Sequence, residues 1–260
     1  MIRWSAHLST LFGEYPPLER PAAAAAAGFE AVETWWPPAD DPDTWVGAVN
    51  DAGLTAALVN ADGGDLAAGE RGFCHVPERR DEVIGAVEAA ARVAVACGGG
   101  AVNLLVGRHD GRRTRTEQLA VARDTVRAAA DRAAELGARI VIEHLNGLEV
   151  NRPLIATPGD ALRFVAAVDH PAVGVLFDAY HAAMIGRDPG DEFARVADRV
   201  GHVQYADCPG RGDPGSGRID LAGFVNRLAA RGYDGCVGLE FLPQASTVAA
   251  LARLPQPPGG

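Results

Sequence analysis

The chain has 260 residues and a formal net charge of −10, because 34 acidic residues outnumber 24 basic ones. Every basic residue is an arginine, which excludes mechanisms that need a Schiff-base or P-loop lysine: pyridoxal phosphate enzymes, lysine aldolases and Walker-type NTPases. The acidic charge argues against a nucleic-acid-binding protein, which needs a basic face to displace counterions. With 48% hydrophobic residues, the chain can bury one barrel-sized core or two ordinary ones.

The cysteines and the first residues carry no sign of an exported or membrane protein. The four cysteines are scattered without a C-x-x-C pair, so we expect no disulfide framework, no thiolate zinc site and a cytoplasmic location. Residues 1–17 contain one basic side chain and no sustained apolar core, which differs from a signal peptide. No apolar run reaches the roughly 18 residues of a membrane span.

Short apolar runs recur along the whole chain and alternate with amphipathic segments. Eight runs are predicted to be strands, at 2–8, 30–36, 54–60, 100–106, 139–145, 173–179, 201–207 and 236–242. The segments between them carry apolar residues at three- and four-residue intervals, which is typical of helices. The clearest helix, at 115–137, ends with Gly137 in a C-cap position.

This alternation predicts an α/β fold, a single (β/α)8 TIM barrel over residues 1–254, with 255–260 as a flexible C-terminal tail. A doubly wound open sheet is the alternative, but no glycine-rich phosphate turn follows the first predicted strand. The longest connecting stretch, at 61–80, is expected to lie over the catalytic face as a lid or substrate loop.

Oxygen-bearing side chains lie at the carboxyl ends of the last four predicted strands, where such a barrel places its chemistry. They are Glu143, Asp178, Gln204 and Glu240, and their separations of 35, 26 and 36 residues each match about one repeat. At matching depth they would converge on one small volume, where three carboxylates repel one another unless a cation or a proton lies among them. The oxygen donors favour Mg²⁺ or Mn²⁺ over zinc. For any single acid, an ion pair or a helix cap is the alternative.

Histidines and one further acid accompany these residues. His181, in the loop after the sixth predicted strand, is expected to contact a substrate hydroxyl or carbonyl. His202 shares a strand face with the amide of the predicted metal set, and both a hydrogen-bonded interior residue and a metal ligand are open for it. His7 and Glu33 are candidates to line the pocket, with a structural histidine and a surface glutamate as the alternatives.

Four arginines lie near the expected mouth of the barrel, namely Arg71, Arg108, Arg152 and Arg211. A guanidinium group is a planar fork that suits a carboxylate, so Arg71, Arg108 and Arg211 are candidates to bind an acidic substrate. Most of the 24 arginines are expected to be solvated surface residues. The glycine-rich stretch at 209–218 lacks the lysine of a phosphate loop and is expected to be a mobile loop on the catalytic face.

Short motifs occur in a specific order along nearly the whole chain. They are RWSAHLSTLF at 3–12, GDLAAGERG at 64–72, NLLVG at 103–107, IEHLN at 142–146, FDAYH at 177–181, GHVQYAD at 201–207 with RGDPGSG after it, and GLEF at 238–241. In this order and spacing the sequence resembles the hydroxypyruvate isomerase family, within the xylose isomerase-like barrels.

The resemblance implies a metal-dependent aldose–ketose type isomerase for a three- or four-carbon hydroxy-oxo acid. The type reaction interconverts hydroxypyruvate and 2-hydroxy-3-oxopropanoate through an enediolate. The resemblance further implies that Glu143 and Glu240 are the proton donor and acceptor. The same two residues, with Asp178 and Gln204, would hold the divalent metal. Related sugar epimerases carry a histidine at the position of Gln204, which favours the isomerase branch.

Other functions stay open at this point. The same site would serve an isomerase or epimerase of a four-carbon 2-oxo acid (2-dehydrotetronate) or of a small ketose. A metal phosphoesterase like the abasic-site endonucleases needs a histidine-rich site and a basic groove, which seven histidines and the acidic charge do not favour. A non-catalytic barrel would have no reason to bear the carboxylate repulsion. Related barrels often associate, so a homo-oligomer, either a dimer or a tetramer, is compatible with the resemblance.

Overall fold

The computed structural model describes residues 2–255, and its strands are parallel and closed into a barrel in chain order. Each strand pairs with the next, and β8 pairs with β1 to close the ring. The strands are β1 (Arg3–His7), β2 (Ala31–Thr34), β3 (Thr55–Asn60), β4 (Ala101–Leu104), β5 (Arg139–Glu143), β6 (Val173–Asp178), β7 (Val200–Tyr205) and β8 (Cys236–Leu239). Each overlaps one of the eight predicted runs, and the predicted (β/α)8 barrel is confirmed.

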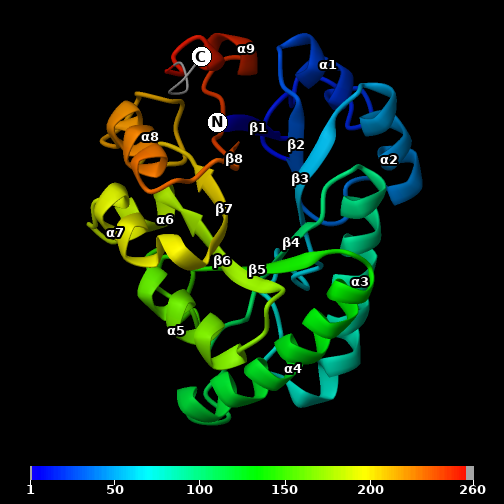
Figure 1. Cartoon of the computed structure of the whole chain (residues 1–260), viewed down its shortest axis with the longest axis vertical. Coiled ribbons are helices and arrows are strands. Elements are labelled where there is room, and N and C mark those ends of the chain that lie inside the picture. The colour runs from blue at the N-terminus through cyan, green and yellow to red at the C-terminus, as the bar shows by residue number, and fades with distance from the viewer. Residues whose placement is uncertain (1, 256–260) are drawn as a thin grey trace.

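Helices surround the barrel (Figure 1). Among the described residues they are α1 (Arg20–Ala26), α2 (Pro42–Asp51), α3 (Arg80–Ala96), α4 (Arg115–Glu135), α5 (Pro158–Val168), α6 (Ala179–Met184), α7 (Pro189–Val196), α8 (Leu221–Ala230) and α9 (Thr247–Leu251). Two short 3₁₀ helices, η1 (Pro77–Arg79) and η2 (Ala197–Arg199), precede α3 and β7. Both α6 and α7 follow β6, so the strand–helix repeat is interrupted there.

The long helix α4 shows how the sequence fixes the ends of an element. The Thr114 hydroxyl accepts a hydrogen bond from the Glu117 N–H, and the Glu117 carboxylate accepts one from the Thr114 N–H at 2.8 Å, which forms a capping box. At the other end, Gly137 has a φ of +79°. This left-handed conformation closes the helix, as the sequence predicts.

Alternation along each strand separates the interior of the barrel from the layer under the helices. In β5, Ile140 and Ile142 belong to the main hydrophobic core, whereas Val141 belongs to a small separate cluster with residues of neighbouring strands. Because successive side chains point to opposite faces of a strand, Glu143 points to the same side as Val141, into the barrel. The same alternation in β6 directs Asp178 inward. The strands therefore carry the candidate acids into the barrel at its carboxyl end.

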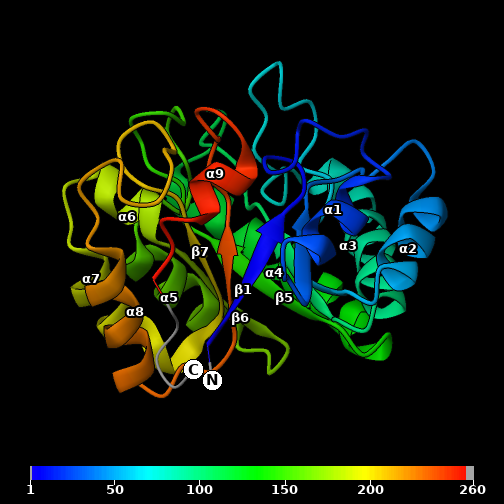
Figure 2. The ribbon, with the colours of Figure 1, turned by 90° about the horizontal axis from the view of Figure 1, so that it is seen from above.

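The two ends of the barrel differ in their loops (Figure 2). The connections that follow the carboxyl ends of the strands gather at one end, and the loop after β3 reaches farthest from the barrel. Residues 61–76 of this loop contain neither helix nor strand, apart from an isolated bridge between Phe73 and Gly107. The segment predicted to cover the catalytic face therefore lies at that face.

Residue 1 and residues 256–260 lie outside the described part of the chain. The domain boundary at 254 and the flexible tail at 255–260 therefore stay predictions. Within residues 2–255, no helix is both long enough and apolar enough to cross a membrane. The four cysteines are buried and unpaired.

Candidate active site

A cavity of about 350 Å³ lies among the loops at the carboxyl ends of the strands. It brings together five residues that the sequence predicts for the site, which are Glu143, Glu240, His181, Arg71 and Arg211. Aromatic and apolar side chains complete its wall, among them Trp35, Trp36, Leu105 and Leu145. A largely apolar wall with a few convergent charged groups is typical of a small-molecule site.

Three buried side chains, of which Glu143 and His181 line this cavity, lie close enough together to hold a metal ion. Ligand atoms of Glu143, Asp178 and His181 all lie within 4.8 Å of one another. The Nε2 atom of His181 is 3.5 Å from Glu143 Oε1 and 3.7 Å from Asp178 Oδ2. Two buried carboxylates at this separation repel each other, and a cation would offset that repulsion.

Asp178 has one satisfied oxygen and one unsatisfied oxygen. Its Oδ1 accepts a hydrogen bond from the Tyr180 N–H at 2.7 Å and so caps α6. Its Oδ2 is buried and has no hydrogen-bond partner among the described residues. Burial raises the pKa of Asp178 to about 6, although the positive charges of His181 and Arg211 act in the opposite direction. A buried acceptor without a donor is costly, so Oδ2 is a candidate metal ligand.

Glu240 follows β8 and is held at the cavity wall by donors from distant parts of the chain. Its Oε2 accepts a hydrogen bond from Arg211 Nη1 at 2.7 Å, and its Oε1 accepts one from Trp35 Nε1 at 2.7 Å. The Nε2 atom of His7 lies 3.5 Å from the same Oε1. Although burial acts to raise it, Arg211 and His7 hold the pKa of Glu240 at about 2. The carboxylate is therefore ionised and oriented at neutral pH.

The four predicted metal ligands are staggered from strand to strand. Glu143 pairs with Leu176, two residues before Asp178, and Asp178 pairs directly with Gln204. Gln204 in turn pairs with the residue two positions before Glu240. A shear of 8 over eight strands shifts the register by about one residue per strand. Steps of two, zero and two residues therefore keep the four positions near one level along the barrel axis.

Gln204 is buried inside the barrel and does not line the cavity. Its Nε2 donates a hydrogen bond to Glu33 Oε2 at 3.0 Å, and its Oε1 is buried without a partner among the described residues. His202 Nε2 lies 2.7 Å from Glu33 Oε1, so His202 is a hydrogen-bonded interior residue here. It does not belong to the metal group formed by Glu143, Asp178 and His181. Glu33 is fully buried, and the sequence-based alternatives of pocket lining and surface exposure are both wrong.

His181 is oriented by the segment that follows β5. The backbone N–H of Asn146 donates to His181 Nδ1 at 3.2 Å. Its Nε2 lies 3.1 Å from Arg211 Nη2, which can only donate, and 3.5 Å from Glu143 Oε1. The imidazole is therefore held between a backbone donor on one side and the cavity arginine and acids on the other.

Arg71 stands out among the predicted anion-binding arginines. It lines the cavity, and its Nη1 donates to two backbone carbonyls of its own loop, those of Leu66 at 3.0 Å and Glu70 at 2.6 Å. Within the described chain it belongs to no ion pair of 4.0 Å or less. Its positive charge is therefore available to an anionic ligand.

The other predicted arginines have different surroundings. Arg211 lines the cavity but is paired with Glu240, and its guanidinium lies 4.8 Å from the centre of the Tyr180 ring. Arg108 donates to the carbonyl of Gly69 at 2.6 Å and does not line this cavity. Arg152 is exposed, away from the cavity wall. Of the four arginines considered, Arg71 and Arg211 line the cavity, and Arg211 contacts one of its acids.

Sequence reasoning missed Asn103 and did not foresee what Trp35 contacts. Asn103 Nδ2 donates to Glu143 Oε2 at 2.7 Å and so orients that carboxylate. The available signal was a polar residue within the apolar run at 100–106, on the inward face of β4. Trp35 follows β2, and its contact with Glu240 spans 205 positions of the sequence. Local sequence patterns cannot predict a contact over such a separation.

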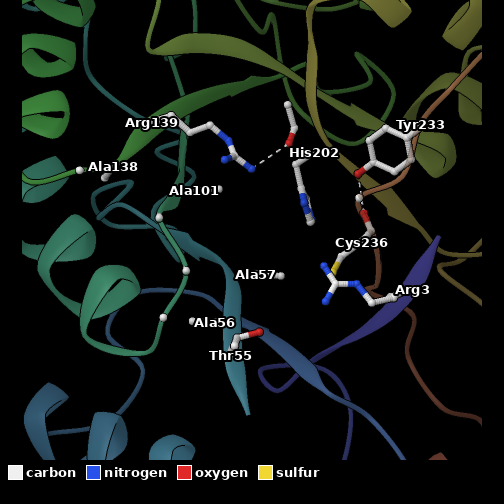
Figure 3. A pocket seen from close by; sticks show the side chains of 16 residues that line it. Arg3, Thr55, Ala56, Ala57, Ala101, Ala138, Arg139, His202, Tyr233 and Cys236 are labelled. Atoms are coloured by element: carbon white, nitrogen blue, oxygen red, sulfur yellow. Dashed lines mark hydrogen bonds between the residues drawn. The ribbon is translucent and has the colours of Figure 1, made fainter. Parts of the chain in front are cut away.

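A second cavity, of about 400 Å³, lies at the opposite, amino-terminal end of the barrel (Figure 3). Arg3 and Arg139 lie at its sides, and the imidazole of His202 points into it. None of the described residues that line it is acidic. His202 therefore lies between this cavity and Glu33 in the barrel interior.

Comparison with known proteins identifies the family of this chain. The model of the family described as xylose isomerase-like TIM barrel matches residues 21–256. A Streptomyces coelicolor protein provisionally named hydroxypyruvate isomerase is 40% identical, over 93% of this chain and 91% of its own. The hydroxypyruvate isomerase of Escherichia coli is 33% identical, over 96% and 97%. The 2-oxo-tetronate isomerase of Cupriavidus necator is 32% identical, over 98% of both chains.

A solved structure from Brucella melitensis, described as an AP endonuclease of family 2, has a TM-score of 0.91 and 33% identity over 97% of both chains. The family model agrees with the barrel that the structure shows. The chain belongs to the hydroxypyruvate isomerase family of the xylose isomerase-like TIM barrels, and it is an isomerase.

Proposed function

We propose that this chain is a metal-dependent isomerase that interconverts hydroxypyruvate and 2-hydroxy-3-oxopropanoate through an enediolate. The observation that most supports this reaction is the pair Glu143 and Glu240, two buried carboxylates on the wall of one small cavity. Moving a carbonyl to the neighbouring carbon requires a proton to leave one carbon and another to reach its neighbour. Two fixed carboxylates at one cavity are suited to that task.

The residues present fit a divalent metal. Two buried oxygens, Asp178 Oδ2 and Gln204 Oε1, have no hydrogen-bond partner among the described residues. Glu143, Asp178, Gln204 and Glu240 would hold the ion, and their oxygen chemistry suits Mg²⁺ or Mn²⁺. When bound, such an ion polarises a carbonyl and neutralises developing negative charge.

The proton transfers fall to the two glutamates. In the forward direction, a proton leaves C3 of hydroxypyruvate, and a proton is delivered to C2 of the enediolate. Glu240, whose carboxylate accepts hydrogen bonds from Trp35 and Arg211, would transfer one of these protons. Glu143, whose carboxylate accepts one from Asn103, would transfer the other. Each positioned carboxylate contributes about 10²–10⁴-fold to the rate.

The substrate carboxylate would bind Arg71. Its side chain lines the cavity and lacks an acidic partner within the described chain, whereas Arg211 is already engaged by Glu240. A planar guanidinium and a carboxylate form strong paired hydrogen bonds. His181, which lines the same cavity, would contact a substrate hydroxyl or carbonyl oxygen.

A four-carbon 2-oxo acid is the second candidate substrate. The relative from Cupriavidus necator, which covers 98% of this chain, is named a 2-oxo-tetronate isomerase, and the same acids and arginine would serve that reaction. Neutral small ketoses would leave the charge of Arg71 uncompensated, which disfavours them. Parallel turnover measurements with hydroxypyruvate, 2-dehydrotetronate and a neutral ketose test the proposal. We expect the highest kcat/KM for one of the two acids, and a clear preference for the neutral ketose would contradict it.

The proposal does not extend to nucleic-acid chemistry. The net charge is −10, and the close metal group includes a single histidine, whereas a nuclease of this architecture would need a basic groove. The cytoplasmic location and a homo-oligomeric assembly, either a dimer or a tetramer, stay predictions from the sequence.

A further inference from the structure

Glu33 is a charged side chain in the centre of the barrel that the proposed reaction does not use. It is fully buried, and its carboxylate accepts hydrogen bonds from three side chains of other strands. Ser5 Oγ donates at 2.5 Å, His202 Nε2 at 2.7 Å and Gln204 Nε2 at 3.0 Å. An ionised carboxylate accepts and never donates, so every group that faces it must turn a hydrogen toward it.

The barrel leaves space for this carboxylate at Gly238. A β-carbon at Gly238 would overlap both carboxylate oxygens of Glu33. Gly238 has no left-handed φ that would require glycine there. The small residue in β8 is therefore explained by the close approach of the Glu33 side chain, which indicates a defined position for it rather than a loosely accommodated charge.

The contact with Glu33 decides which way the Gln204 amide faces. An amide side chain can rotate by 180° and exchange its oxygen with its nitrogen at little steric cost. Opposite a carboxylate, only the nitrogen can face Glu33, so the oxygen must face the other way. That oxygen is buried and unpartnered within the described chain. Gln204 pairs in register with Asp178, whose Oδ2 is also unpartnered, and paired residues point to the same side of a sheet.

We propose that Glu33 is a positioning residue, which holds the Gln204 amide with its oxygen turned toward the metal group and its nitrogen turned away. This role rests on the proposed metal-dependent function and deepens it. Glu33 also accepts hydrogen bonds from Ser5 and His202, but it is its own contact with the Gln204 amide that orients the ligand. An outer residue that orients a metal ligand in this way is typically worth 10–100-fold in metal affinity.

Glu33→Gln tests this role by calorimetric titration of the metal-free protein with Mn²⁺. The variant keeps the size of the side chain but adds a donor, so the Gln204 amide is free to turn its nitrogen toward the metal group. We expect the Kd for Mn²⁺ to rise about 10–100-fold. The matched control is Ser5→Ala, which removes another hydrogen bond from the same carboxylate without touching Gln204. It should leave the Kd within about threefold of wild type.

The Gln204→Glu substitution provides the decisive second step. In the Glu33→Gln background, the carboxylate introduced at position 204 can accept from the amide introduced at position 33 with one oxygen and keep the other for the metal, so Mn²⁺ affinity should recover. In the wild-type background the same substitution brings two carboxylates into contact, where they repel each other. There it should give no gain in Mn²⁺ affinity. Circular dichroism confirms that each variant is folded. Should Glu33→Gln not fold, Glu33→Asp replaces it, because it keeps the charge but shortens the reach to Gln204.

The outcomes separate the two levels of the proposal. Wild-type protein that binds no Mn²⁺ would overturn the proposed function and the role of Glu33 with it. Wild-type binding with an unchanged Kd in the folded Glu33 variant would overturn the role of Glu33 alone. An effect of Gln204→Glu that is equal in both backgrounds would do the same, because it would show that the two residues act independently.

Discussion

Two buried carboxylates inside the same barrel have opposite surroundings. Glu33 accepts three side-chain hydrogen bonds. Although burial acts to raise it, the pKa of Glu33 lies below its usual value, mainly because of the adjacent His202. Asp178 has a single backbone donor, an unpartnered oxygen and a pKa raised by burial to about 6.

The difference separates a supporting acid from a ligand-binding acid. A carboxylate with a full set of donors is stable as an ion inside a protein, whereas one with a missing donor is costly until a proton or a cation compensates it. The first kind fixes its neighbours. The second kind is available for binding, and in this barrel it lies beside the cavity.

Glu240→Gln removes a carboxylate at the cavity, and it should have the largest effect of the substitutions considered. We expect kcat to fall by about 10²–10⁴-fold, because a neutral amide cannot transfer the proton. Turnover is followed by proton NMR with metal present. The control is Glu192→Gln, a buried acid paired with Arg187 and Arg195 away from the cavity. Wild-type-like turnover in metal-loaded Glu240→Gln would remove Glu240 from the catalytic pair.

Asp178→Asn and Glu33→Gln should change the stability of the metal-free protein in opposite directions. The folded state raises the pKa of Asp178 from 3.8 to about 6, so the free energy of unfolding falls as pH rises from about 4 to about 6. The amide that replaces this carboxyl group does not titrate and still accepts the hydrogen bond that caps α6. Asp178→Asn should therefore be more stable than wild type at pH 7, by up to roughly 3 kcal/mol, and its stability should vary less over this pH window.

Glu33→Gln should instead destabilise the metal-free protein at pH 7. Its folded-state pKa is lowered, so the stability that it contributes is present above the unfolded pKa and is lost as pH falls. Chemical denaturation of both variants at pH 4 and pH 7 measures these changes. If both substitutions changed the free energy of unfolding at pH 7 in the same direction, the two acids would not differ as described.

Metal binding should compensate the unpartnered carboxylate oxygen of Asp178 and so stabilise the folded protein. At a free Mn²⁺ concentration of about 100 times Kd, binding stabilises the fold by about 2.7 kcal/mol. We expect the Tm of wild type to rise with Mn²⁺ and to return to its starting value with excess EDTA. Asp178→Asn should show a much smaller rise at the same Mn²⁺ concentration. An equal rise in both proteins would remove Asp178 from the ligand set.

Arg71→Ala should affect substrate binding more than chemistry. Losing a charge-assisted hydrogen bond to the substrate carboxylate costs about 1.5–3 kcal/mol, which corresponds to roughly a 10–100-fold rise in KM. The control is Arg108→Ala, because Arg108 lies in a neighbouring loop but does not line the cavity. Steady-state kinetics with an acidic substrate measures both variants. Equal changes in KM would contradict the proposal that Arg71 binds the substrate carboxylate.

Sequence patterns were enough to predict the barrel and the end of each strand that carries the acids. Strand alternation is local, so Glu143 and Asp178 could be placed on inward positions from the sequence alone. The contact between Glu33 and Gln204 spans 171 positions and crosses the barrel, so it depends on strand tilt and register, which hydrophobic patterning does not encode. The pairing of Arg211 with Glu240 joins two loops and was equally hidden.

The most direct test of the central claim is proton NMR in D₂O with hydroxypyruvate, run with Mn²⁺ and again with excess EDTA. With the metal, we expect 2-hydroxy-3-oxopropanoate to form with deuterium at C2, and the recovered hydroxypyruvate to gain deuterium at C3. With EDTA, both signals should be absent. Turnover that is unaffected by EDTA, or no deuterium exchange into hydroxypyruvate or a four-carbon 2-oxo acid with the metal present, would contradict the account.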